Sequence, residues 1–171
     1  MTDTDIWVRT APDIDWVYRA CIEFDADTSL GLDDETAAAH ALTVMAAVAA
    51  CEYDAAVIRQ AVALGVHPHV GVELVLEMRN VRGPFRIGPV ELVPGVSQRD
   101  RRGFLLLVRD GNPVGQWEVG AARGNAQAVL ESVACGRLDT AYWMALRKVA
   151  GVDPDVAGRT VEALGAVRRQ R

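Results

Sequence analysis

Residues 104–119 read FLLLVRDGNPVGQWEV, the clearest local pattern in the chain. An apolar run leads into Asp110-Gly111-Asn112-Pro113, whose residue types favour a tight turn, and alternating polar and apolar residues follow. This order predicts a β-hairpin. Because alternate residues of a strand share a face, we expect Trp117 to pack inward together with Leu105 or Leu106.

The segments on either side of this hairpin set the fold class. Residues 34–64 and 125–169 show the three- and four-residue spacing of helices, whereas residues 70–119 alternate like β-hairpins. Alternation of single strands with single helices is absent. The order therefore predicts an α+β fold, with an antiparallel sheet of about four to five strands packed against N-terminal and C-terminal helices. We find no repeat and no linker, so we expect residues 1–171 to form a single α+β domain.

Glycine, proline and acidic residues indicate where the other elements begin and end. The expected elements are a short strand at 6–9, a helix from Pro12 to Phe24, a loop at 25–32, a helix capped by Asp33 or Asp34 with a break near Glu52–Asp54, a third helix ending at Gly65, a strand from Val70 to Met78, a second strand region at 83–95, a helix from Asn125 that Gly136 stops, another through Val149, and a last helix from Asp153-Pro154.

The helix expected to begin near Asp34 is apolar nearly all round. Its polar residues Thr36, His40 and Thr43 occupy one narrow stripe, and a helix in a single-domain protein normally has a wider polar face. We therefore expect other helices or a second subunit to bury the surplus, and a symmetric dimer is the commonest arrangement. The apolar residues concerned are Ala37, Ala38, Ala41, Val44, Met45 and Val48.

Charge is unevenly distributed along a chain of net charge −5. Residues 1–35 hold ten acidic residues against two arginines, whereas residues 78–123 hold eight arginines against four acidic residues. These segments offer complementary surfaces, either within one molecule or between neighbours.

The chain shows no sign of export or of a membrane span. Its N-terminal residues are acidic, unlike a signal peptide, and its longest uncharged stretch, 36–51, is shorter than a bilayer span. Cys21, Cys51 and Cys135 are odd in number and lie far apart, which favours buried thiols over disulfides. We expect a cytoplasmic protein that does not associate with membranes.

The segment His67-Pro68-His69, followed by Glu73, is the best candidate metal site. Two histidines two residues apart on an extended segment point to the same side, and Glu73 can join them. The spacing resembles the first half of the metal box of cupins. The resemblance ends there, because no histidine follows position 69 and too few strands remain for a cupin barrel. We favour a loop without a metal and expect no cofactor.

Two other groups of residues can carry chemistry. His40 can serve as a general base or can form a hydrogen bond within the core. Arginines beside Phe85 and Phe104 resemble a surface for RNA or phosphate, but the acidic net charge and the lack of a recognition motif argue against nucleic acid. We expect these arginines to form an interaction surface: Arg79, Arg82, Arg86, Arg99, Arg101 and Arg102.

No complete catalytic or cofactor motif is present: the chain has no Gly-rich nucleotide loop, nucleophile elbow or Cys-x-x-Cys pair. The sequence therefore favours a non-enzymatic interaction or assembly protein that acts as a homo-oligomer or within a larger complex. An alternative is a small-ligand or metal-binding enzyme that uses His67, His69, Glu73 or His40. A weaker alternative is RNA or phosphate binding through the segment from Arg79 to Arg102.

Overall fold

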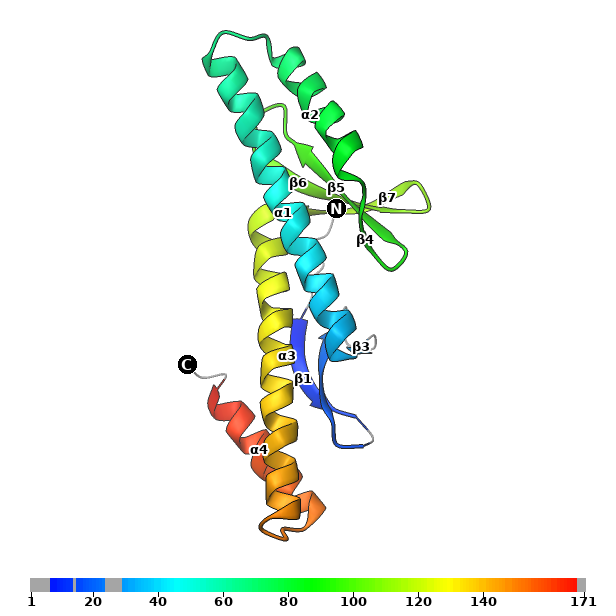
Figure 1. The fold of residues 1–171 in the computed structure, drawn as a ribbon, viewed down its shortest axis with the longest axis vertical. Helices are drawn as coiled ribbons and strands as arrows, with labels where there is room; N and C mark the ends of the chain where they lie inside the picture. Colours follow the sequence, from blue (N-terminus) through cyan, green and yellow to red (C-terminus); the bar gives the residue numbers. More distant parts are fainter. Residues whose placement is uncertain (1–6, 14, 24–28, 169–171) are drawn as a thin grey trace. The chain divides into compact units, whose positions relative to one another are not determined.

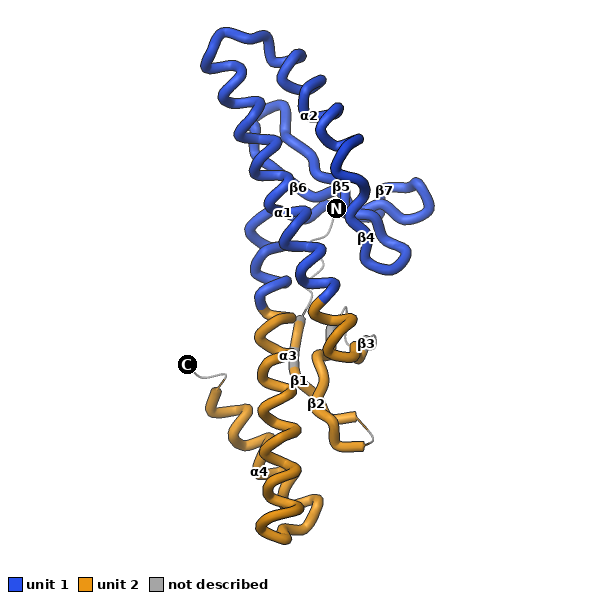
Figure 2. The backbone as a smooth tube through the Cα atoms, viewed as in Figure 1, with its two compact units in different colours: residues 1–2, 39–127 blue, residues 3–38, 128–171 orange. Residues whose placement is uncertain are grey.

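The structure, a computed structural model, describes residues 7–13, 15–23 and 29–168 (Figure 1). The chain divides into two compact units, drawn in different colours in Figure 2. Unit 1 contains residues 1–2 and 39–127, and unit 2 contains residues 3–38 and 128–171. The expectation of a single domain stays a prediction. Ile6, Phe24, residues 25–28 and the last residue of the expected C-terminal helical region lie outside the described residues.

The elements follow one another in a clear α+β order. They are β1 (Trp7–Pro12), β2 (Tyr18–Glu23), β3 (Ser29–Leu32), α1 (Asp34–Ala63), α2 (Pro68–Arg82), β4 (Phe85–Ile87), β5 (Val90–Val96), β6 (Gly103–Arg109), β7 (Asn112–Glu118), α3 (Val119–Lys148) and α4 (Pro154–Arg168). The predicted α+β class with antiparallel strand pairing is confirmed. The strands, however, form two sheets, β1-β2-β3 and β4-β5-β6-β7, rather than one.

The predicted hairpin at 104–119 forms β6 and β7 of unit 1. Asp110 and Gly111 have φ angles of 51° and 76°, which a turn with two left-handed central residues requires. Leu105 pairs with Trp117 across the two strands; Leu105 is fully buried and Trp117 is half-buried. The inward direction expected for Trp117 is therefore confirmed, although its ring is not fully enclosed.

In unit 1, α1 packs directly on the four-stranded sheet. The Cys51 thiol donates to the carbonyl oxygen of Phe104 (Sγ–O 3.1 Å), and a Cβ on Gly103 would lie 3.0 Å from the Cβ of Cys51. Small residues at this crossing allow the helix to approach the sheet closely. The core here contains Val48, Cys51, Ala55 and Ile58 from α1 and Leu92, Pro94 and Leu105 from the sheet.

The strand predicted from Val70 to Met78 is wrong, because these residues lie in helix α2. The buried residues of this helix are Gly71 and Val75, four positions apart, whereas alternating apolar residues such as Val72 and Leu74 are exposed. Pro68 stands in the first turn and His67 is the N-cap, both of which are signals for a helix start. A Cβ on Gly71 would lie 3.4 Å from the Cα of Ile58, so α2 packs closely against α1.

In unit 2, the helix predicted from Pro12 to Phe24 is also wrong. Residues after Pro12 turn back into strand β2, and Tyr18 pairs with Pro12. The side chain of Asp13 holds this turn, since its Oδ1 accepts hydrogen bonds from the backbone N–H groups of Asp15 and Val17, both at 2.9 Å. Part of the loop predicted at 25–32 is strand β3.

Two breaks predicted within helices are absent. Helix α1 continues through Glu52–Asp54, and α3 continues through Gly136. Gly136 instead marks a close contact between α3 and β2, because a Cβ there would lie 2.5 Å from the carbonyl oxygen of Tyr18. The predicted start of the last helix is confirmed: α4 begins at Pro154, and Asp153 accepts a hydrogen bond from the N–H of Asp155 at 3.0 Å.

Candidate functional site

The residues of the predicted metal site do not surround a common point. The Nδ1 of His67 accepts a hydrogen bond from the N–H of His69 (3.3 Å) as the cap of α2. His69 Nε2 lies 3.0 Å from Glu73 Oε1, one helical turn away, and both side chains are exposed. Within residues 7–13, 15–23 and 29–168, no group of three or more His, Cys, Asp or Glu residues could hold a metal ion. The extended geometry assumed in the prediction is therefore wrong.

His40 lies half-buried on α1, the helix for which the sequence predicted a narrow polar stripe. The hydroxyl groups of the two threonines of that stripe form hydrogen bonds with nearby residues of the chain. Thr43 Oγ1 donates to the carbonyl oxygen of Ala39 (2.9 Å), and Thr36 Oγ1 donates to the carboxylate of Asp33 (2.7 Å). Each threonine hydroxyl therefore donates its proton to a group other than His40.

The six predicted interaction arginines do not form one patch. Arg79, Arg82 and Arg86 lie near the start of β5, whereas Arg99, Arg101 and Arg102 follow its end. A seven-residue strand separates these groups by about 20 Å. Several are engaged within unit 1: Arg86 pairs with Glu91 (3.4 Å) and Arg102 with Asp100 (3.7 Å).

Asp54 on α1 is the most constrained charged residue that the structure describes. Its side chain is fully buried, and its two carboxylate oxygens accept hydrogen bonds from Arg79 (Nε–Oδ2 3.0 Å) and Arg82 of α2. Both arginine side chains are about one quarter exposed and border a cleft of about 310 Å³ that Phe85 and Glu91 also line. These contacts join α2 to α1, so we assign this charged cluster a structural role.

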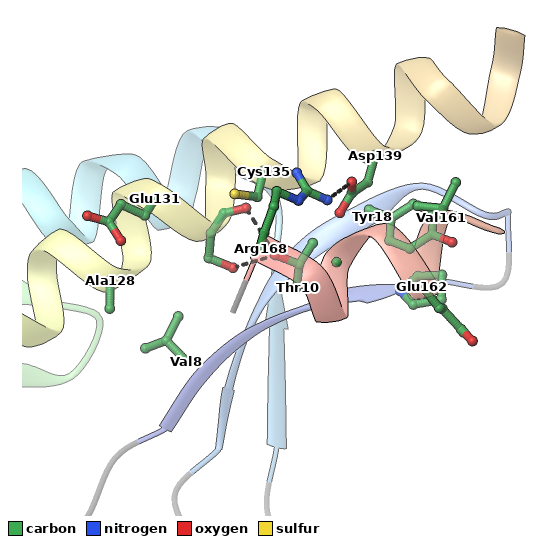
Figure 3. Close-up of a pocket in the computed structure, with 13 residues that line it drawn as sticks. Val8, Thr10, Tyr18, Ala128, Glu131, Cys135, Asp139, Val161, Glu162 and Arg168 are labelled. Atoms are coloured by element: carbon green, nitrogen blue, oxygen red, sulfur yellow. Dashed lines mark hydrogen bonds and ion pairs between the residues drawn. The ribbon is translucent and has the colours of Figure 1, made fainter. Parts of the chain in front are cut away.

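Unit 2 contains a larger cleft, of about 650 Å³, between strands β1 and β2 and helices α3 and α4 (Figure 3). Thr10 and Ser132 share a hydrogen bond (Oγ1–Oγ 3.1 Å), and Arg168 pairs with Asp139. Tyr18, 4% exposed, and Val161 also line the cleft.

The hydroxyl of Tyr18 has no hydrogen-bond partner among the described residues. Burial raises the pKa of Tyr18, and the negative charges of Glu162 and Asp139 raise it further.

The composition of this cleft limits the chemistry it can support. Among the described residues that line the cleft, the carboxylates of Glu131, Asp139 and Glu162 outnumber the single cation, Arg168, so a cationic group fits this lining better than an anion. The thiol of Cys135 also lines it. A nucleophilic cysteine needs a nearby base, and none of the described residues that line this cleft is a histidine.

Cys135 should nevertheless react with iodoacetamide at least about tenfold faster than the other two cysteines at pH 8. Cys51 is fully buried, and burial raises its pKa to about 11, whereas Cys21 is 7% exposed and Cys135 is half-buried beside the cleft. Peptide mapping by mass spectrometry after timed labelling measures the three rates. Modification of Cys51 before Cys135 would show that the packing of α1 on the sheet opens readily.

Helix α1 presents an exposed stripe, apolar except for Gln60, that we call the α1 seam. Its members recur at alternating spacings of four and three residues, and all are exposed. Leu42 and Tyr53 are 61% and 58% exposed. The α1 seam consists of Leu42, Ala46, Ala49, Tyr53, Ala56, Gln60 and Ala63, all within unit 1.

By length and composition, α1 also passes the test for a helix that could cross a membrane, with a mean hydropathy of 1.6 over its most apolar window. Half of that window is buried inside the fold, and a core helix gives the same result. The expectation that the protein does not associate with membranes stays a prediction.

Comparison of the chain with protein-family models, curated proteins and solved structures gives no match. The geometry of the described residues is therefore the basis for a functional assignment.

Proposed function

We propose that the protein is a non-catalytic assembly component of the cytoplasm that works by binding a second copy of itself. The observation that carries this proposal is the α1 seam. Its seven positions span three heptads with the spacing of a coiled-coil interface, and its side chains face solvent in the single chain.

The buried side of α1 already packs within its own chain, and the α1 seam on the other side stays uncovered. Ala41, Val44 and Val48, which the sequence identified as part of an apolar surplus, are buried inside the protein. The exposed residues lie on the opposite side of the helix, among them Leu42 and Tyr53. A helix with apolar residues on both sides needs a second partner to cover the outer one.

The two alternative functions have less support. The residues of the proposed metal enzyme, His67, His69, Glu73 and His40, include only one close pair, His69 with Glu73. The arginines of the proposed phosphate surface are split between two ends of β5, and Arg79 and Arg82 are engaged by Asp54.

Sedimentation equilibrium of the full chain at micromolar concentration should show a dimer. Ala49→Asp places a charge in the middle of the α1 seam and should weaken self-association at least about tenfold, because the carboxylate would lose its water in the interface. Ala121→Asp is the matched control, since Ala121 is an exposed helical alanine outside the seam, and it should leave self-association unchanged. A wild-type protein that stays monomeric at all concentrations would refute the proposal.

A further inference from the structure

The residues on either side of the α1 seam determine in which relative direction two α1 helices can pair. In coiled-coil notation, the a positions are Ala46, Tyr53 and Gln60, and the d positions are Leu42, Ala49, Ala56 and Ala63. The g positions that precede each a residue are Met45, Glu52 and Arg59, and the e positions are Thr43, Ala50, Val57 and, after the helix end, Leu64. The charged residues of both flanks are Glu52 and Arg59, which have opposite sign and share the g flank.

We infer that two copies of the chain pair antiparallel through the α1 seam, with Glu52 of each copy against Arg59 of the other. This inference rests on the proposed function and adds its partner geometry. In an antiparallel pair, g positions face g positions, and a two-fold axis makes both contacts identical. In a parallel pair, g faces e, so Glu52 would meet Val57 and Arg59 would meet Leu64, and neither charge would find a partner.

The same register also gives complementary packing along the α1 seam. Antiparallel helices stack a positions on d positions, and the charge pairing places Tyr53 of one copy on Ala56 of the other. In the flanking layers, Gln60 meets Ala49 and Ala46 meets Ala63. Tyr53 and Gln60 therefore each face an alanine, the pairing of large with small side chains that fills an interface, whereas Ala46 and Ala63 bring two small residues together and Leu42 lies beyond these layers.

Charge also excludes the neighbouring registers. Sliding one helix by a heptad in one direction brings Glu52 of one copy opposite Glu52 of the other. Sliding it in the opposite direction brings Arg59 opposite Arg59. Like charges in register are unfavourable, so a single antiparallel register satisfies both the apolar spacing and the two charges.

Glu52 and Arg59 each have a partner within the chain that does not exhaust their hydrogen-bonding capacity. Glu52 Oε1 lies 2.6 Å from Arg123 Nη2, and the Glu52 side chain is 51% exposed. Arg59 Nη1 donates to the carbonyl oxygen of Arg101 (3.3 Å). Since a carboxylate accepts several hydrogen bonds and a guanidinium has five N–H donors, each group can also bind its counterpart in the second copy.

Charge reversal tests the pairing. Glu52→Arg or Arg59→Glu alone should weaken dimerisation about tenfold in sedimentation equilibrium at low salt, because each creates two repulsive contacts in a symmetric dimer. The double variant Glu52→Arg/Arg59→Glu should recover to within about threefold of wild type. Glu91→Arg and Arg86→Glu change the net charge equally at an exposed pair of the sheet and should have no effect.

Cross-linking tests the orientation in a Cys135→Ser background. Thiols introduced together by Ala49→Cys and Gln60→Cys should form a disulfide-linked dimer on oxidation, because antiparallel pairing puts these positions in one layer. Eleven residues separate them on one helix, about 16 Å, so they cannot bridge within a chain. Ala49→Cys alone should not cross-link.

The possible results separate the orientation from self-association. Rescue by the double charge reversal together with the 49–60 link would support the antiparallel register. Rapid cross-linking of Ala49→Cys alone indicates a parallel pair, and a stable dimer insensitive to all these changes indicates another interface. Either result overturns this inference while leaving the proposed function intact. A monomeric wild-type chain refutes both.

Discussion

The double variant Arg79→Met/Arg82→Met is expected to lose about 3–5 kcal/mol of unfolding free energy. Methionine keeps much of the apolar stem of each arginine but removes the guanidinium groups that bind Asp54. The Asp54 carboxylate would then be fully buried without a cation, and an unpaired buried charge is among the most destabilising changes in a protein. Urea unfolding at pH 7 measures the loss.

Removing the unpaired Asp54 carboxylate as well should restore most of the lost unfolding free energy. The triple variant Asp54→Leu/Arg79→Met/Arg82→Met replaces the whole cluster by apolar residues and should regain most of the lost stability, because desolvated ion pairs contribute little more than apolar packing. Arg86→Met is the control at the exposed Arg86–Glu91 pair and should change stability by less than about 0.5 kcal/mol. A double variant as stable as wild type would show that Asp54 is reached by water.

Asp54 also shows why the sequence predicted a break in α1. Acidic residues near Glu52–Asp54 in an apolar helical run suggest a solvent-exposed turn, and the partners that allow Asp54 to be buried lie 25 and 28 residues later on α2. No local pattern identifies those two arginines as its ligands. Asp54 shares a helix face with Cys51 and Ile58, so its periodicity was the available signal.

Elements fixed by local chemistry were predicted well. The β6–β7 hairpin depends on the φ angles of Asp110 and Gly111 within its own turn, and the start of α4 depends on Asp153 and Pro154. In contrast, β2 depends on pairing with β1 and β3, so its residues alone read equally well as an amphipathic helix. The prediction of a strand in the α2 segment failed for a similar reason, because the neighbouring α1 determines which residues of α2 are buried.

The candidate sites also depended on residues that are distant in the sequence, and this limited their prediction. The candidate metal site at the histidines, which the sequence did not favour, depended on an extended segment, whereas His67 is a helix cap. The arginine cluster is compact in sequence but split in space, because β5 runs between its two halves. The apolar residues of α1 that the sequence named as surplus are buried or half-buried within the chain, and none of them belongs to the α1 seam. Identifying the exposed side of α1 required knowledge of what covers the inner side.

Gly136→Ala and Gly124→Ala should change stability in opposite directions, although both glycines lie within helix α3. Alanine favours a helix interior over glycine by about 1 kcal/mol, so propensity alone predicts stabilisation at both positions. A Cβ on Gly124 would meet nothing within 4 Å, and we expect Gly124→Ala to stabilise by about 0.5–1 kcal/mol. Urea unfolding midpoints provide the comparison.

At Gly136 the added methyl group would lie 2.5 Å from the carbonyl oxygen of Tyr18 and 3.2 Å from its carbonyl carbon. Those atoms belong to strand β2, so relief requires backbone movement rather than a change of rotamer. We expect the clash to outweigh the propensity gain and to leave Gly136→Ala about 1–3 kcal/mol less stable than wild type. Equal stabilisation by both substitutions would mean that α3 and β2 do not touch at Gly136. The residue would then be the helix-weakening glycine that its sequence context suggested, and not the point where a helix meets a strand.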